Sequence, residues 1–384
     1  MELTKDEEAA LKGEKGETLE LAYRILVATG EATDAEKLVP IEWAHLSGVN
    51  YNTIGDAGEE FLSKLSQDAK VIVKTTLNPM GFDIDKVSKY DLSENFIEKQ
   101  QSICNSYEKI GVTPSFSCIP YEIFDLPEKG TQVAFAETNA AIYANSVAHL
   151  KTNKESAFSA LASALTGKSP YSDLRKDNEP NLTIRMKIEE PNELTIGMLG
   201  FFAGKVADNS VLISGVKDLD KRSCKSLCAG MGTSGTCGKF VLDDGSKSSE
   251  KIDFDKKEMD KIYDELNSAN HGDLITLGSP QLGLDEISDL ASMLKNRSFK
   301  KRCIVFCPRA VQEQARKIGY TNELERAGCE ILSDCCTCLT PLIDKKDVDS
   351  VTTNSIKGAY YLKNSNKVDV NLKPLSEIIR DETK

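Results

Sequence analysis

The sequence predicts an α/β fold with parallel sheets, organised in more than one lobe. The first observation is length, because 384 residues exceed the roughly 100–200 residues of one domain. The second is an alternation in the C-terminal half. There, short apolar runs at 273–277, 303–306 and 329–332 are separated by amphipathic stretches at 284–294 and 310–318. This alternation indicates right-handed βαβ units and a parallel sheet.

The N-terminal third is predicted to be mainly helical, with one strand. Thr4 is a suitable N-cap for the acidic run that follows it, and Gly111 is a plausible C-cap of a later helix. A β-branched run at 70–76 predicts a buried strand that ends at Asn78-Pro79. Apolar spacing predicts helices over 5–11, 19–30, 56–68, 93–110 and 137–150.

Two stretches are predicted to be loops or turns. Around 167–181 the residues Ser, Pro, Asp, Asn and Lys crowd together, which is typical of a surface loop, so we place a possible lobe break there. The stretch Gly230–Gly238 is glycine-rich but lacks the spacing of a dinucleotide-binding loop, and we interpret it as a turn region.

Charge and hydropathy disfavour two classes of partner. The chain has 48 Lys and Arg against 60 Asp and Glu, a net charge of −12, and no basic stripe, so nucleic-acid binding is not expected. The best apolar run, 194–203, is far shorter than the ~20 residues that cross a bilayer, so no membrane association is expected. The acidic first residues lack the apolar core of a signal peptide, which predicts a cytoplasmic protein.

Eleven cysteines are the most informative feature of the composition. An odd number without an export signal argues against a disulfide framework. The cluster Cys335-Cys336-x-Cys338 follows the predicted strand 329–332, and Gly278-Ser279-Pro280-Gln281 follows 273–277. Ligands of parallel sheets bind beyond the carboxyl ends of the strands. With only three histidines, a metal here would be held by thiolates.

Seven sequence blocks occur in a defined order along nearly the whole chain: HLSGVNYNTIGDAG (45–58), TTLNPMGFD (75–83), PSFSCIPYE (114–122), AETNAAIYANSV (136–147), KTNKESAFSALASALTG (151–167), PRAVQEQARKIGYTNELERAGCEILSDCC (308–336) and TTNSIKGAYYL (352–362). Together they resemble the large subunit of the aconitase X family. The resemblance implies an aconitase-like, multi-lobed α/β/α fold, with 1–384 as the catalytic region.

The resemblance also implies an activity, a cofactor and a partner. It implies a hydro-lyase that dehydrates a small anionic hydroxy acid, with an iron–sulfur cluster, 4Fe-4S, as Lewis acid. Asn78-Pro79 and the block at 354–360 look most like the branch that converts (R)-5-phosphomevalonate to trans-anhydromevalonate 5-phosphate in isoprenoid precursor synthesis. Because the chain ends soon after the large-subunit blocks, we expect a separate small swivelling subunit.

Three other functions are weighed against this one. A cis-3-hydroxy-L-proline dehydratase would share the family, and a cluster-less metabolite-binding paralogue would share only the fold. A cysteine-rich protein with structural zinc would use Cys335–Cys338 and Cys224-x-x-x-Cys228, although the paired Cys-x-x-Cys spacing that zinc favours is absent.

The resemblance assigns candidate cluster ligands. Cys118 matches the first family ligand and Cys336 the last, with Cys335 and Cys338 as rivals of Cys336. The family has a cysteine at the position of Ser279, and serine is a poor iron ligand beside thiolates. Either another cysteine takes its place, or the cluster is altered or absent. The substitutes considered are Cys224, Cys228, Cys237 and Cys307.

Substrate-binding residues are carried over in the same way. They are Gly48, Val49 and Asn50 in one loop, Asn78 and Pro79 in another, Glu137 and Thr138 at one helix start, and Ser355 and Lys357 at another. Backbone N–H groups at helix starts can hold an anion. Glu137, Ser355 and Lys357 are the catalytic candidates. The alternatives are a carboxylate favoured by the helix dipole for Glu137 and a capped surface helix for Ser355 and Lys357. Arg309 is a further candidate anion partner.

Overall fold

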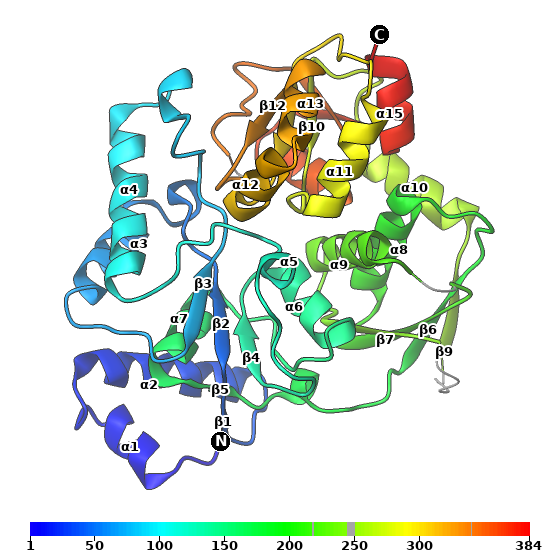
Figure 1. Ribbon diagram of the computed structural model, residues 1–384. Helices are drawn as coiled ribbons and strands as arrows, with labels where there is room; N and C mark the ends of the chain where they lie inside the picture. Colours follow the sequence, from blue (N-terminus) through cyan, green and yellow to red (C-terminus); the bar gives the residue numbers. More distant parts are fainter. Residues whose placement is uncertain (217–218, 244–249, 339) are drawn as a thin grey trace.

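The computed structural model describes residues 1–216, 219–243, 250–338 and 340–384. Three parallel sheets of three, four and five strands follow one another along the chain, and a short antiparallel pair joins β1 (Leu38–Pro40) to β5 (Lys168–Pro170). In Figure 1 the C-terminal third lies above the N-terminal sheet, and the middle third lies beside both. The predicted α/β fold with parallel sheets is confirmed.

The first sheet has the order β3-β2-β4, and its strands are β2 (Trp43–Leu46), β3 (Lys74–Leu77) and β4 (Val133–Phe135). β3 begins later than predicted. The helix predicted over 56–68 is the part of α3 (Tyr51–Leu65) that follows a kink at Gly55, where φ is 57° and ψ is −164°. A first turn precedes the kink, and the Asn50 side chain caps it by accepting a hydrogen bond from the backbone N–H of Asn52. The helices of this part are α1 (Lys5–Leu11), α2 (Glu17–Ala32), α3 (Tyr51–Leu65), α4 (Glu94–Lys109), α5 (Pro120–Ile123), α6 (Thr138–Ser146) and α7 (Ala157–Thr166), with a 3₁₀ turn η1 (Val87–Lys89).

The second sheet has the order β8-β7-β6-β9, with β6 (Leu182–Met186), β7 (Ser210–Ser214), β8 (Lys239–Leu242) and β9 (Glu250–Phe254). Its helices are α8 (Glu193–Val206), α9 (Lys221–Ser234) and α10 (Lys256–Leu266). The predicted turn at Gly230–Gly238 is wrong in its first half, because α9 continues to Ser234, whereas residues 235–238 do form the connection to β8. A Cβ at Gly230 would lie 2.1 Å from the carbonyl oxygen of Gly197 in α8. Glycine therefore allows the two helix backbones to touch.

The third sheet has the order β12-β11-β10-β13-β14, and all its pairs are parallel. The predicted strands 303–306 and 329–332 are confirmed at both ends, as β11 (Cys303–Phe306) and β12 (Cys329–Leu332). The other strands are β10 (Leu274–Leu277), β13 (Ser350–Thr353) and β14 (Asp369–Leu372), and the helices are α11 (Leu284–Met293), α12 (Arg309–Lys317), α13 (Tyr320–Arg326), α14 (Ile356–Asn364) and α15 (Leu375–Glu382).

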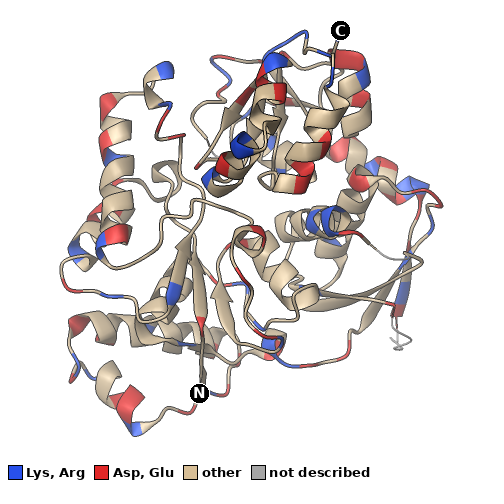
Figure 2. Ribbon diagram, in the orientation of Figure 1, with Lys and Arg blue, Asp and Glu red and all other residues tan. Residues whose placement is uncertain are grey.

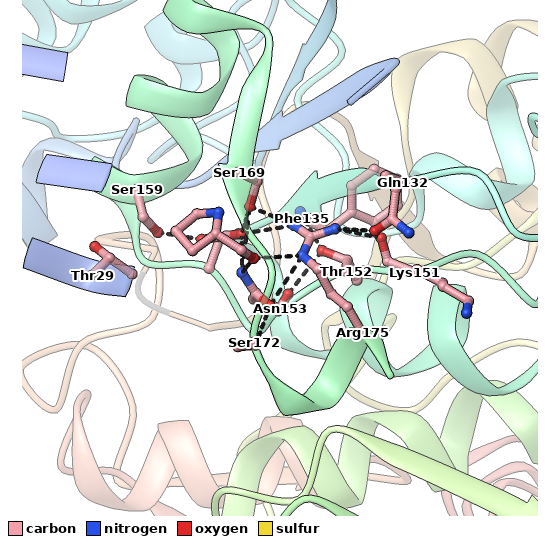
Figure 3. Close-up of polar contacts among 12 residues, drawn as sticks. Thr29, Gln132, Phe135, Lys151, Thr152, Asn153, Ser159, Ser169, Ser172 and Arg175 are labelled. Carbon is pink, nitrogen blue, oxygen red and sulfur yellow. Dashed lines mark hydrogen bonds and ion pairs between the residues drawn. The ribbon is translucent and has the colours of Figure 1, made fainter. Parts of the chain in front are cut away.

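The segment 167–181 is a surface loop only in part. It contains β5 and a 3₁₀ turn, η2 (Asp173–Arg175), and the Arg175 side chain is fully buried. Figure 3 shows Gln132, Asn153 and Ser169 around the Arg175 guanidinium, and the Ser172 hydroxyl donates to Asn153. Exposed residues occur further along, at 177–179. The lobe break near 167–181 stays a prediction.

No helix in the described part of the chain is long and apolar enough to cross a membrane. In the ribbon of Figure 2, positions of Lys and Arg alternate with positions of Asp and Glu along the outer helices, which agrees with the absence of a basic stripe in the sequence.

Candidate functional site

The candidate site lies where the carboxyl ends of the first and third sheets meet. Asn78 follows β3 and Glu137 follows β4, while Ser279 follows β10 and Ser355 follows β13. Hydrogen bonds and an ion pair join the two sets of loops. The edge of a parallel sheet at its carboxyl ends is the usual place for a ligand, and here two such edges face each other.

Lys357 is at the centre of this site. It lies in the first turn of α14, and its ammonium group pairs with the carboxylate of Glu137 and donates to Asn139 Oδ1 at 2.8 Å. Burial disfavours its charge. The carboxylate of Glu137 and the thiols of Cys118, Cys338 and Cys336 outweigh burial, so the pKa of Lys357 is raised well above its usual value. Lys357 is therefore a fixed cation.

A chain of polar contacts continues from Glu137 into the first sheet. Asn78 Nδ2 donates to Glu137 Oε2 at 2.7 Å, and His45 Nε2 lies 3.2 Å from Asn78 Oδ1. His45 Nδ1 lies 2.8 Å from the hydroxyl of Thr76, which accepts from Trp43 Nε1. This arrangement assigns the proton of neutral His45 to Nε2. Burial lowers the pKa of His45 to about 4, although Glu137 and Asn78 oppose it.

Three of the eleven cysteines share this site. The Sγ of Cys118 accepts a hydrogen bond from the backbone N–H of Gln281 at 3.2 Å, and the Cys336 thiol donates to the carbonyl of Cys338 at 3.3 Å. Cys118 and Cys338 are buried, whereas Cys336 is partly exposed. Each is close enough to Lys357 to raise its pKa. Asn139 contacts both Lys357 and the carbonyl of Cys118, and the Sγ of Cys338 lies 4.0 Å from the carbonyl of Lys357. The three cysteines therefore lie around the start of α14.

The pKa values of these thiols are shifted in opposite directions. Burial raises the pKa of Cys118 to about 12. Burial also disfavours a thiolate at Cys338, but hydrogen bonds with Cys336 and Ser279 and the charge of Lys357 outweigh it, so the pKa of Cys338 is lowered. A hydrogen bond with Cys338, followed by burial, raises the pKa of Cys336. Cys338 is thus the thiol of this pair that ionises first.

Ser279 occupies a fixed loop beside Cys338. Its hydroxyl oxygen lies 3.1 Å from the Sγ of Cys338, and its backbone carbonyl accepts a hydrogen bond from the Ser355 hydroxyl. Ser355 is also the N-cap of α14, because its hydroxyl accepts from the backbone N–H of Gly358 at 2.8 Å. Ser355 therefore ties the loop after β10 to the start of α14.

The other substitutes considered for Ser279 have their contacts elsewhere. Cys224 hydrogen-bonds to the carbonyl of Leu219, and Cys237 to that of Lys239. Ser333 is among the neighbours that shift the pKa of Cys307, and Cys224 is among those that shift the pKa of Cys228. Ser279 is not a neighbour of this kind for either thiol.

The remaining candidates lie around the site. The loop Gly48–Asn50 leaves the first sheet between the loops of Asn78 and Glu137. The carbonyl of Val49 accepts from Gln100 Nε2 at 2.7 Å, so Val49 is held against α4. Pro79 is buried beside Asn78. Thr138 begins α6 and packs against α9, where a Cβ at Gly232 would lie 3.1 Å from that of Thr138.

Arg309 has a different role from the one considered. Its guanidinium pairs with Asp83 at 3.0 Å and also with Asp334 and Asp85. These ion pairs join the loop after β3 to the third sheet. The anion-binding interpretation of Arg309 is therefore corrected to a structural one.

The implied iron–sulfur cluster can be tested against these donors. Among the residues described, no three His, Cys, Asp or Glu side chains are arranged to hold a metal ion. A multi-iron cluster is larger than one ion, so its ligands stand further apart. Thiolates are the usual cluster ligands, and three cysteine sulfurs gathered around one cation match that donor chemistry. The residues present fit a cluster.

Sequence reasoning did not predict the site contacts of four residues: His45, Asn139, Gln281 and Cys338. Gln281 holds the chain near Cys118, because its Oε1 accepts from the Cys118 backbone N–H at 3.1 Å. Asn139 Nδ2 donates to the carbonyl of Cys118 at 2.9 Å. A usable signal existed for Gln281, which lies in a predicted strand-end loop. His45 lies inside a strand and carried none.

Comparisons with known proteins agree with this architecture. Family models described as the first, second and third domains of aconitase X match residues 1–177, 180–264 and 272–384. The phosphomevalonate dehydratase large subunit of Methanocaldococcus jannaschii is 35% identical over 402 residues, which cover 99% of this chain and 100% of the relative. The cis-3-hydroxy-L-proline dehydratase of Hypocrea jecorina is 30% identical over 390 residues, 94% of this chain and 65% of the relative.

A solved structure gives the same result for the fold. The crystal structure of Thermococcus kodakaraensis aconitase X in its holo-form superposes with a TM-score of 0.91 at 31% sequence identity and covers 100% of both chains. Similarity in sequence and in structure thus extends over the whole chain. The chain belongs to the aconitase X family.

Proposed function

We propose that this chain is the large subunit of a hydro-lyase that dehydrates (R)-5-phosphomevalonate at an iron–sulfur cluster. The observation that carries the proposal is the gathering of three cysteine sulfurs around the Lys357–Glu137 pair, at the junction of two sheet edges. The names of the relatives support the substrate. Several relatives similar over nearly their full length are called phosphomevalonate dehydratase large subunits.

The reaction requires two things of the protein. A weakly acidic proton next to a carboxylate must leave, and hydroxide, a poor leaving group, must depart from the neighbouring carbon. When bound, an iron–sulfur cluster with an open iron supplies a Lewis acid for the departing hydroxyl. Cys118 and Cys336 are the ligands that we assign to it from the family pattern.

Lys357 is suited to binding the anionic substrate. Its ammonium stays protonated because of Glu137 and the thiols, and among the described residues it has two acceptors, Glu137 and Asn139. An ammonium group has three donors, so a carboxylate or phosphate oxygen can take the third. Ser355 holds the start of α14, and with it Lys357, against the Ser279 loop.

Glu137 is the carboxylate best placed to accept a proton. One of its oxygens pairs with Lys357 and the other accepts from Asn78, so its orientation is fixed from both sides. A positioned carboxylate within reach of substrate is a typical general base. The loops at Gly48–Asn50 and Asn78-Pro79, with Thr138, are proposed to line the rest of the substrate site.

The small swivelling subunit is the proposed partner, since the relatives are named large subunits. We further propose a cytoplasmic location. A cis-3-hydroxy-L-proline dehydratase remains the second candidate, because two enzymes of that name are 30% and 28% identical to this chain.

The test is a turnover assay under anaerobic conditions with the chain and its small subunit together. (R)-5-phosphomevalonate should lose one water per molecule, as followed by mass spectrometry, and either polypeptide alone should be inactive. Lys363→Met is the matched control for a variant of Lys357, because both lysines lie in α14. It should keep activity, since the Lys363 ammonium donates to the carbonyl of Glu265. Turnover of cis-3-hydroxy-L-proline instead would select the second candidate, and turnover of neither compound would reject both.

A further inference from the structure

We propose that Cys338 takes the place of the missing family cysteine, so that Cys118, Cys336 and Cys338 hold the cluster and Ser279 does not. This inference rests on the proposed function, because it concerns the ligands of the proposed cluster. It assigns a ligand role to Cys338, a residue to which the family pattern gives no such role.

The first support is the distance between the two side chains. Ser279 Oγ and Cys338 Sγ are 3.1 Å apart, so the sulfur of Cys338 lies beside the position from which a cysteine at 279 would present its own. The two side chains reach this position from different loops, one after β10 and the other in the segment that follows β12. Cys338 can thus supply a sulfur donor with little change in location.

The second support is that the surroundings hold both loops in place. The Ser279 carbonyl is bound by Ser355, and a Cβ at Gly358 would lie 3.4 Å from the Cβ of Ser279, so the loop lies directly against α14. The Sγ of Cys338 lies 4.0 Å from the carbonyl of Lys357, in the same helix. The start of α14 therefore contacts both residues.

The third support is the geometry of the Cys336-x-Cys338 pair. The Cys336 thiol reaches the carbonyl of Cys338, so the backbone turns back on itself here and keeps the two residues together. The neighbouring Cys335 does not share this arrangement. Its carbonyl accepts from Gln281 Nε2 at 3.0 Å, and the charged and thiol groups beside its side chain are Asp83, Asp334, Cys307 and Lys86.

The experiment measures iron, acid-labile sulfide and the visible spectrum after anaerobic reconstitution of the chain with its small subunit. Cys338→Ser should lose iron and sulfide to the level of Cys118→Ser. Cys335→Ala is the matched control and should keep them. Ser279→Cys in the Cys338→Ser background should restore the cluster, because it returns a thiolate to the same position from the other loop.

The outcomes separate this inference from the proposed function. If wild type and Cys338→Ser carry equal iron, sulfide and absorption, the inference is wrong and the proposed function stands. If wild type binds no cluster but Ser279→Cys gains one, Cys338 is not a substitute, and the proposed function fails for the natural chain. If neither binds a cluster, both are rejected.

Circular dichroism of the apo-proteins controls for folding. If Cys338→Ser also lowers the melting temperature of the apo-protein, the double variant decides the question. Recovery of iron and absorption in that variant supports Cys338 as the ligand, and failure to recover them overturns it.

Discussion

Two buried cations of this molecule, Arg175 and Lys357, are each paired with a carboxylate, yet their surroundings differ. All three guanidinium nitrogens of Arg175 have acceptors: Asn153, Pro170, Gln132, Lys151, Glu155 and Ser169. Its partner Glu155 also accepts from Asn153, Ser159 and Ser169. Figure 3 shows how closely these groups surround the guanidinium.

Lys357 has fewer hydrogen-bond acceptors than Arg175, and its other neighbours include thiols. Its ammonium donates to two oxygen acceptors among the described residues, and three thiols are among its electrostatic neighbours. A fully bonded buried network fixes structure, whereas a charged group with remaining donors can bind something else. The number of remaining hydrogen-bonding positions, rather than burial or charge, distinguishes the candidate site from the structural network.

The largest effect should come from Arg175→Met. Glu155 would then be buried without its cation, and we expect the free energy of unfolding to fall by about 3–5 kcal/mol. Guanidinium denaturation followed by circular dichroism measures it. The control is Arg185→Met, which breaks an exposed pair with Asp253 and should cost at most about 1 kcal/mol. Equal losses in the two variants would contradict the structural role of Arg175.

Lys357→Met should produce the opposite profile. Activity should fall by about 10²–10³-fold in kcat, because a charge directed at the reacting substrate is removed. The free energy of unfolding should fall less than in Arg175→Met, since Lys357 donates to two residues among those described whereas Arg175 donates to six. Steady-state kinetics and denaturation on the same preparations give both quantities. A variant that is destabilised but fully active would remove Lys357 from the site.

The third prediction concerns pH, because Arg175 stays charged whereas His45 can titrate. His45 has a pKa of about 4 when folded and 6.5 when unfolded, so the unfolded chain binds more protons between these values. Stability from this group is present above pH 6.5 and is lost as pH falls toward 4, by about 2 kcal/mol between pH 7 and pH 5. Denaturation at pH 5, 6 and 7 should show a shallower dependence in His45→Gln. Parallel pH profiles would exclude His45 as the cause.

Ser279→Ala should have the smallest effect. The Ser279 hydroxyl contacts the thiol of Cys338, and the loss of one such hydrogen bond costs about 1 kcal/mol or less. Iron content should not change. Thermal unfolding and iron analysis measure the two, and a large loss of iron in this variant would mean that the serine oxygen itself is a ligand.

Some elements could be predicted from sequence because their signals are local. β11 is a continuous apolar run followed by an amphipathic helix, and β12 is a mostly apolar run that follows helices; both were found at their observed bounds. The polar stretch around Arg175 was predicted to be a surface loop although Arg175 is buried. The reason is that hydrogen bonding within a buried network leaves no apolar pattern in the sequence. Gly230 was assigned to a turn because its reason for being glycine is a contact with Gly197, which is distant in the sequence.

The candidate site shows the same limit. The strand ends correctly directed attention to the loops of Ser279 and Cys336, because topology places such loops on one edge. Spacing along the chain could not show which thiol lies beside Ser279. Cys338 was weighed only as a rival of Cys336, and its position beside Ser279 follows from the folding of two loops against α14.

The burial of the cysteines also gives the protein a built-in reporter. Of the eleven thiols, ten are buried and Cys336 is partly exposed. A bulky thiol reagent added to the native apo-protein should therefore count one accessible equivalent before unfolding releases the others. If Cys336 is a cluster ligand, that one equivalent disappears when the cluster is loaded, and a colorimetric titration then reports the fraction of loaded molecules in any preparation.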